Sequence, residues 1–121
     1  MKANELMNGV FVYFNCFDGS KIVVRMTGFK DGIVYGNSKN GSHWCNIDKV
    51  EPIPLTAEIL EKNGFVKESR ESFGNTLQYC ILTDGLWIDI SGENFFEGKL
   101  EYVHQLQHAL RLCEIEKEIK L

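Results

Sequence analysis

The chain has 121 residues, 44% of them hydrophobic and 25% charged, a balance typical of a globular protein that builds its own core. The net charge of −4 disfavours nonspecific nucleic-acid binding, because such binding depends on a basic face that neutralises phosphates. No apolar run approaches the roughly 20 residues that span a bilayer, and the N-terminus lacks the apolar core of a signal peptide. We therefore expect a cytoplasmic protein that does not bind membranes.

The four cysteines are spread about thirty residues apart, at Cys16, Cys45, Cys80 and Cys113, with no Cys-x-x-Cys pair. Zinc sites usually bring their ligands in closely spaced couples, so this distribution argues against a zinc site. We expect thiols that act as small buried hydrophobes, and no metal or other cofactor.

The first half of the chain predicts short strands joined by tight turns, after a lead-in with a turn of helix at residues 3–7. Asp-Gly pairs at residues 18–19 and 31–32 favour hairpins, since these residues tolerate a positive φ. The strands are expected at residues 10–14, 22–26, 33–35, 43–47 and 50–53. This spacing is typical of a β-meander or small barrel, and the opening Glu5-Leu-x-x-Gly-x-x-Val12 resembles the start of an SH3-like barrel.

The stretch from Val50 to Phe65 divides the chain. Pro52 and Pro54 fix their own φ and bias the preceding residues toward extended backbone, which predicts that a strand stops here. Thr56 then suits the N-cap of a short helix, because its hydroxyl can accept a bond from a free backbone amide.

Both ends of this short helix carry apolar and glycine signals. Leu55 before the cap and Leu60 one turn into the helix have the spacing of a hydrophobic staple. Gly64 suits the left-handed residue after the helix, and Phe65 is placed to fold back on Leu60.

The second half predicts a hairpin followed by a long helix. Asp84-Gly85 joins two strand-like runs at residues 76–83 and 86–90, and residues 65–68 and 95–100 are further candidate strands. Residues 69–75 are polar and predict a loop.

From Glu101 the apolar residues recur at helical spacing, with a stripe formed by Val103, Leu106, Leu110 and Cys113. For residues 114–120 we favour continuation of the helix with fraying over a final strand. The expected fold class is α+β. Residues 1–54 would form an SH3-like β-meander or barrel, and residues 55–121 the short capped helix, an antiparallel hairpin and a C-terminal helix packed on it, either as a second domain or as part of one composite domain.

Three pieces of the chain resemble a family of short uncharacterised proteins encoded in prophage-like and other mobile elements of gut anaerobic bacteria. They are Lys2-Ala-Asn-Glu-Leu6 with Gly9, then Glu51-Pro-Ile-Pro-Leu-Thr-x-Glu-Ile-Leu-x-Lys-Asn-Gly-Phe65, and Tyr102-Val-His-Gln-Leu-Gln107 with Leu110-Arg-Leu-Cys113. The middle piece is the most specific. The resemblance implies a small intracellular protein of mobile-element background, and it implies no activity, cofactor or catalytic residue.

The C-terminal helix holds the first candidate site. His104 and His108 are four residues apart, so both imidazoles could face one metal ion, with Glu101 as a third ligand. Arg111 on the same flank disfavours a cation, and we favour the interpretation that these residues form an ordinary polar flank. Tyr102, His104 and Gln107 border the apolar stripe, where neutral polar groups could bond the backbone of a neighbouring sheet or of a partner.

The second candidate site is His43-Trp44-Cys45 on a predicted strand. His43 and Cys45 would share one face, as a nucleophilic pair requires, but no orienting carboxylate is evident, so we favour a half-buried strand. Aromatic rings crowd this half of the chain, and we expect most of them to pack in the core. One or two left exposed would mark a surface that binds a peptide or unstacked bases, and Trp44 is included among the candidate binding residues. The aromatic residues are Phe11, Tyr13, Phe14, Phe17, Tyr35 and Trp44.

Three functions follow from these patterns. We favour a non-enzymatic binding or accessory module of a mobile element, with a protein as its partner, because no nucleophile, acid–base pair or metal cluster converges in the sequence. The alternatives are a small metal-dependent or hydrolytic enzyme centred on His104 and His108, and a small barrel that binds nucleic acid. A homo-oligomer formed through an exposed strand edge or the C-terminal helix is a further expectation.

Overall fold

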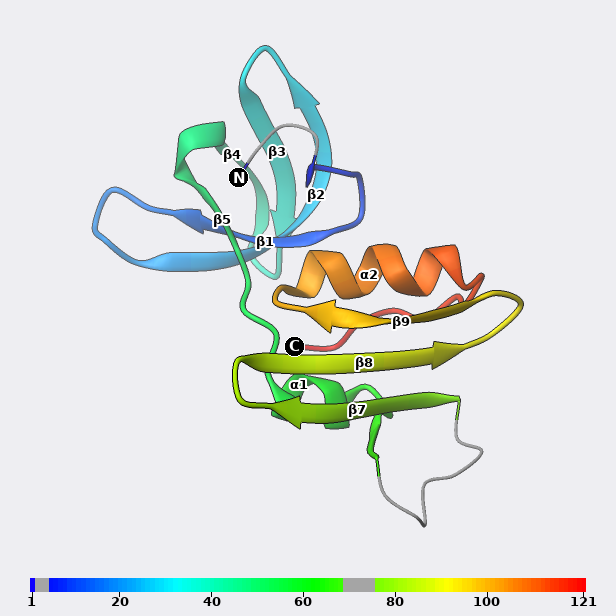
Figure 1. Cartoon of the computed structure of the whole chain (residues 1–121). Helices are drawn as coiled ribbons and strands as arrows, with labels where there is room; N and C mark the ends of the chain where they lie inside the picture. The colour runs from blue at the N-terminus through cyan, green and yellow to red at the C-terminus, as the bar shows by residue number, and fades with distance from the viewer. Residues whose placement is uncertain (2–4, 69–75) are drawn as a thin grey trace. The chain divides into compact units, whose positions relative to one another are not determined.

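The computed structural model describes residues 1, 5–68 and 76–121, and over these residues the fold is mixed α+β. The chain divides into two compact units, Met1–Ile53 and Pro54–Leu121 (Figure 1). Residues 3–4 of the predicted turn of helix at residues 3–7 lie outside the described residues, and so does the whole of the predicted loop at residues 69–75.

The first unit is one antiparallel sheet whose strands lie in the order β4-β3-β2-β1-β5. A short 3-10 helix, η2 (Ile47–Lys49), leads from β4 into β5. The strands are β1 (Phe11–Asn15), β2 (Lys21–Lys30), β3 (Ile33–Ser38), β4 (Gly41–Asn46) and β5 (Val50–Pro52). All five strands lie where the sequence predicts them, with β2 and β3 several residues longer than expected.

Alternation along these strands builds the core of the first unit. Val12 and Phe14 of β1 and Val24 and Met26 of β2 are buried, while their neighbours in sequence are more exposed. Gly36 lets β3 approach β2 closely, because a Cβ at this position would collide with the Val24 side chain and the backbone of Arg25. The remaining buried members of this core are Val10, Val34 and Val50.

The first sheet stays open. β4 and β5 are the two edge strands, and the described residues form no ladder between them. The SH3-like barrel expected from the sequence is therefore not confirmed. Because η2 spans only three residues, the two edges approach each other where this short helix joins them, although they do not pair.

The second unit begins with the short helix that the sequence predicts. Helix α1 (Ala57–Lys62) starts at Thr56, whose hydroxyl accepts a hydrogen bond from the Ile59 amide at 3.2 Å. It ends at Gly64, which has a φ of +87°, and the Phe65 amide donates to the Leu60 carbonyl at 3.0 Å. The predicted cap and the predicted left-handed glycine are both confirmed.

The sheet of the second unit has the order β6-β7-β8-β9, with β6 parallel to β7 and the other pairs antiparallel. Its strands are β6 (Val66–Lys67), β7 (Leu77–Leu82), β8 (Gly85–Ser91) and β9 (Phe95–Leu100). The predicted hairpin between β7 and β8 is confirmed. Tyr79, Ile88 and Leu100 are buried on one face of this sheet, and the Tyr79 hydroxyl donates to the Glu61 carboxylate of α1 at 2.5 Å.

Helix α2 (Val103–Leu112) carries the predicted apolar stripe, and Val103, Leu106, Leu110 and Cys113 are all buried. The predicted continuation of this helix through residues 114–120 is wrong. Glu114 adopts a φ of +57°, and the Ile115 amide donates back to the Leu110 carbonyl at 2.9 Å, which ends the helix and turns the chain.

The chain after α2 is held by Asn63, a buried amide that the sequence analysis did not single out. Its Nδ2 donates to the carbonyls of Ile59 at 2.8 Å and Lys120 at 2.7 Å, and its Oδ1 accepts from the Lys120 amide at 2.7 Å. Beside this clamp Ile119 is only 3% exposed. The C-terminal residues therefore pack as an extended tail rather than as helix.

We expect Leu60→Ala to lower the free energy of unfolding by about 2–5 kcal/mol, because the side chain is fully buried and its loss leaves a cavity. Chemical denaturation measures this change. Glu58→Ala, at an exposed position of the same helix, is the control and should change stability little. Equal stability of the wild type and Leu60→Ala would contradict the packing described for α1.

We expect Asn63→Ala to cost about 1–3 kcal/mol, because Ile59 and Lys120 lose buried hydrogen-bond partners. Hydrogen exchange at the Lys120 amide should speed up together with that of the neighbouring tail amides. Lys62→Ala is the control, since the Lys62 ammonium also bonds the tail, at the Leu121 carbonyl, but is exposed. Unchanged exchange at Lys120 would show that Asn63 does not hold the tail.

Candidate functional site

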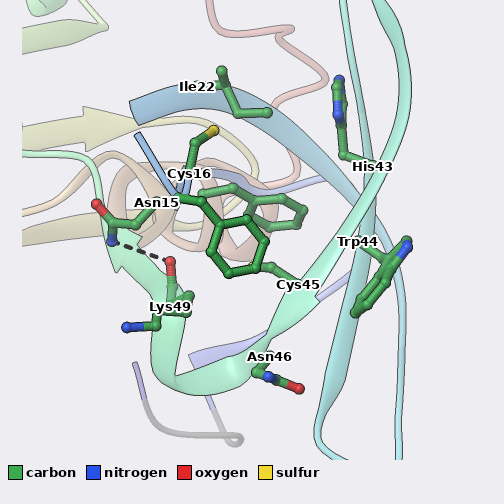
Figure 2. Close-up of a pocket in the computed structure, with 10 residues that line it drawn as sticks. Asn15, Cys16, Ile22, His43, Trp44, Cys45, Asn46 and Lys49 are labelled. Atoms are coloured by element: carbon green, nitrogen blue, oxygen red, sulfur yellow. Dashed lines mark hydrogen bonds between the residues drawn. The ribbon is translucent and has the colours of Figure 1, made fainter. Parts of the chain in front are cut away.

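A hollow of about 580 Å³ opens on the first unit, and it is the candidate site (Figure 2). One side is formed by the end of β1, the following turn and the start of β2, and the other by β4 and η2. Its lining residues are Phe14, Asn15, Cys16, Phe17, Ile22, His43, Trp44, Cys45, Asn46 and Lys49. Most of these side chains are apolar, aromatic or sulfur-containing, and the few polar ones could orient a ligand.

The turn between β1 and β2 projects Phe17 into solvent. The Asp18 carboxylate accepts hydrogen bonds from the Ser20 hydroxyl at 2.6 Å and the Ser20 amide at 2.9 Å. These bonds lower the pKa of Asp18, the hydroxyl bond being the larger cause. The Cys16 amide also bonds the Ser20 carbonyl at 2.8 Å. The turn is thus closed around its own polar groups, and Phe17 is left fully exposed.

The opposite side of the hollow is β4, where alternation separates the side chains. His43 and Cys45 are half-buried, whereas Trp44 is 65% exposed. Figure 2 shows Trp44 and Cys45 on opposite sides of the β4 ribbon. The His43 Nε2 lies 2.6 Å from the Ser38 hydroxyl, so this ring nitrogen is engaged by β3. His43 and Cys45 share a face, as the sequence analysis expected.

The Cys45 thiol is poorly suited to nucleophilic chemistry. Partial burial, followed by the nearby Asp48 and Cys16, raises the pKa of Cys45 to about 11. The thiolate is the reactive form of cysteine, and at this pKa almost none of it exists at neutral pH. With His43 bonded to Ser38, the geometry offers no activated Cys–His pair.

Two of the candidate residues on the C-terminal helix are buried, His104 at 2% exposure and Gln107 at 9%. The interpretation of the His104 side of the helix as an ordinary polar flank is therefore wrong for His104. Gln107 was expected beside the apolar stripe rather than on that flank. The helical stripe alone could not reveal this burial, because the burying surface comes from other elements.

The rings of Tyr102, His104 and His108 form a packed row. Tyr102 and His104 are stacked with centroids 5.7 Å apart, and His104 and His108 meet edge to face at 5.9 Å. Burial, and then the Arg111 charge, lower the pKa of His108, which favours the neutral imidazole. Tyr102 precedes the helix, and its amide donates to the Gln105 side chain at 3.1 Å.

The described residues contain no group of three or more His, Cys, Asp or Glu side chains arranged to hold a metal ion, so Glu101 is not brought in as a third ligand. Of the five residues proposed for binding, Trp44 belongs to the first unit and Tyr102, His104, Gln107 and His108 to the second. Only Trp44 lines the hollow.

Phe17 is one of the six aromatic residues that crowd the first half of the sequence, and it was not among the predicted binding residues. The signal was its position directly before the Asp-Gly turn, where a large ring has no neighbouring strand to cover it. Cys16, Ile22 and Lys49 were not foreseen as parts of a site, since each comes from a different element.

Comparisons of the chain with protein-family models, with curated proteins and with solved structures found no match. Within the described residues, no helix is both long and apolar enough to cross a membrane.

We expect the Cys45 thiol to react slowly with iodoacetamide at neutral pH, because its pKa lies near 11 and the thiolate is scarce. Its rate should rise about tenfold per pH unit between pH 7 and pH 9 without levelling, whereas a free cysteine levels above its pKa of about 8.5. Mass spectrometry of the peptide that contains Cys45 measures this rate. A rate that already levels near pH 7 would reveal an activated thiol.

Proposed function

We propose that this chain is a non-enzymatic binding module whose partner is a protein, and that the hollow of the first unit receives an apolar side chain of that partner. The observation that carries the proposal is the exposure of Phe17, 113% at the turn that lines the hollow, together with Trp44, 65% exposed on the strand that forms its other side. Large rings held in solvent on an ordered turn and an edge strand are characteristic of binding surfaces.

The energetics of the hollow support this role. Burial of one large apolar side chain contributes about 1.5–3 kcal/mol, so a partner that covers Phe17 and fills the hollow gains useful affinity. The backbone that carries Phe17 needs little further ordering on binding, because the bonds between Asp18 and Ser20 already close the turn. Asn15, Asn46 and Lys49 supply polar groups beside the apolar lining.

Charge favours a protein over a nucleic acid as the partner. Lys49 is the cation that lines the hollow, and the nearby Lys21 is paired with Glu51 at 2.7 Å. Asp18 and Asp48 flank the lining residues in sequence, and the chain as a whole carries −4. A phosphate backbone would meet little net attraction at such a surface.

The proposal also includes an SH3-like arrangement of the first unit and an accessory role in a mobile element. The strand order β4-β3-β2-β1-β5, with a 3-10 helix before the last strand, supports an SH3-like arrangement of the first unit. An accessory role in a mobile element rests on the sequence resemblance alone.

We expect peptides selected on the wild-type protein from a random library to bind Phe17→Ser at least tenfold more weakly, because the exposed ring no longer covers the bound side chain. Isothermal titration calorimetry measures the affinities. Phe95→Ser is the matched control, since Phe95 is 79% exposed on β9 and should not affect binding. Thermal melting of both variants checks that they fold.

Peptides that bind Phe17→Ser as tightly as the wild type would overturn the assignment of the hollow. A single-stranded oligonucleotide, used as a second probe, distinguishes a nucleic-acid partner from a protein partner. Phe17-dependent binding of oligothymidylate in the absence of any selected peptide would replace a protein partner with unstacked bases.

A further inference from the structure

Strand β4 presents a row of backbone groups that its own sheet does not use. The Ile47 amide donates to the Gly32 carbonyl at 2.9 Å, and these two residues continue the register of the β3–β4 ladder. This bond therefore shows which of the facing pairs in the ladder are the hydrogen-bonded ones. In an antiparallel ladder the residues alternate between facing the neighbouring strand and facing away from it. With this pattern, the N–H and C=O groups of Ser42, Trp44 and Asn46 point away from β3, toward the free edge.

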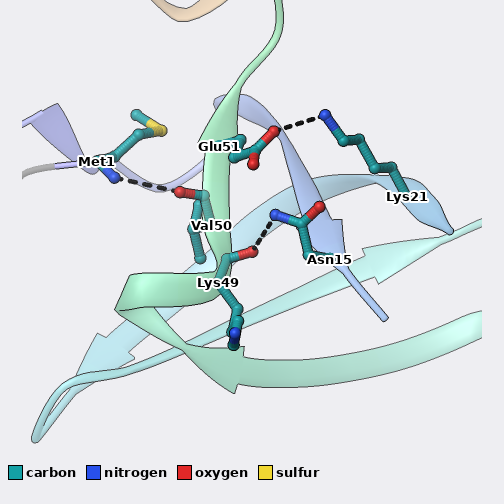
Figure 3. Close-up of polar contacts among 6 residues, drawn as sticks. All are labelled: Met1, Asn15, Lys21, Lys49, Val50 and Glu51. Atoms are coloured by element: carbon teal, nitrogen blue, oxygen red, sulfur yellow. Dashed lines mark hydrogen bonds and ion pairs between the residues drawn. The ribbon is translucent and has the colours of Figure 1, made fainter. Parts of the chain in front are cut away.

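The other described sheet edges carry features that discourage pairing with a second chain. Figure 3 shows the amino group of Met1 donating to the Val50 carbonyl of β5 at 3.1 Å, and the pairing of Lys21 with Glu51. β5 is also three residues long and includes Pro52. In the second unit β6 has two residues, and β9 carries Glu97 and Lys99. Short strands, prolines and charges are the usual protections of an edge.

Strand β4 has none of these protections. Its sequence, Gly41-Ser-His-Trp-Cys-Asn46, contains no Lys, Arg, Asp, Glu or Pro, and its pairing with β3 is regular over all six residues. The flanking charges, Lys39 and Asp48, lie outside the strand. A regular, neutral edge with an exposed tryptophan at its centre is open to another strand.

We propose that β4 pairs in antiparallel fashion with β4 of a second copy of the chain, about a two-fold axis at Trp44. The outward-facing residues are spaced evenly on both sides of Trp44, so Ser42 of one copy meets Asn46 of the other and the two Trp44 residues meet each other. Each of these facing pairs exchanges two N–H···O bonds. The same edge is thus complementary to itself, as a two-fold interface requires.

The side chains of β4 fit this pairing. No like charges meet across the axis, because the strand has no Lys, Arg, Asp or Glu and His43 of one copy would face Cys45 of the other. The two Trp44 rings, each 65% exposed in the single chain, come together on one face of the joined sheet. One strand pair makes a small interface, so we expect a monomer–dimer equilibrium in the micromolar range rather than a permanent dimer. This inference concerns the backbone edge and does not depend on the hollow binding a partner.

Two charge variants at the axis test the pairing. In Trp44→Lys and in Trp44→Glu the new charges of two copies would face each other, so each variant alone should be monomeric at concentrations where the wild type dimerises. An equimolar mixture of the two should recover the dimer, because Lys then faces Glu. Sedimentation velocity over a concentration series measures the fraction of dimer for each variant and for the mixture. Trp87→Lys, which removes a 39% exposed ring from β8, is the control and should leave the equilibrium unchanged.

A second pair of variants places charges away from the axis, at two exposed positions. Ser42→Glu combined with Asn46→Lys sets opposite charges across the interface and should tighten the dimer, whereas Ser42→Lys combined with Asn46→Lys should weaken it. A wild type that stays monomeric throughout the series overturns the proposal, and so does a dimer that survives in Trp44→Lys. The register centred on Trp44 is overturned if the Trp44 variants lose the dimer and neither their mixture nor the chain with Ser42→Glu and Asn46→Lys forms it.

Discussion

The backbone between Val50 and Phe65 is the constraint on which the rest of the chain depends, because its residues complete structure in both units. Val50–Pro52 form β5 and pair with β1, which gives the first sheet its last strand. Pro54 bridges to Tyr102, and the Leu55 amide donates to the Glu101 carbonyl at 2.9 Å within the second unit. The two prolines restrict the backbone around residues 51–54 before any tertiary contact forms, so this part is already extended for its pairing with β1 and its bridge to Tyr102.

The second unit is held together by polar groups as well as by its apolar face. Asn63 is buried, and its side-chain amide has two N–H donors and an oxygen acceptor. It can therefore bond both the N–H and the C=O groups of a backbone, whereas a carboxylate has no donor and a hydroxyl has only one. Asn63 thus joins the end of α1 to the tail that follows α2. Asn63 and Gly64 are adjacent, so one residue clamps the tail while the next, with its positive φ, follows the end of the helix.

The first unit combines a packed core with two edge strands, β4 and β5, that do not pair with each other. Its valines fill the core, while the sheet remains open where η2 carries the chain from one edge strand to the other. The hollow lies against that open side, and so does the free edge of β4. Side-chain recognition in the hollow and backbone pairing along β4 therefore involve the same region, and Trp44 belongs to both. The raised pKa of Cys45 suits its place in the lining of the hollow, because the thiol stays protonated at neutral pH.

The sequence by itself determined what depends on neighbouring residues: the strands around Asp-Gly turns, the Thr56 cap, the glycine at position 64 and the apolar stripe of α2. Of the candidate site it identified Trp44. Only tertiary structure decided that His104 and Gln107 are buried, that Asn63 holds the tail, that the first sheet stays open, and that Phe17 remains in solvent. The physical reason is that caps, turns and helical periodicity are fixed within a few residues, whereas burial and strand-edge exposure depend on surfaces supplied by distant parts of the chain.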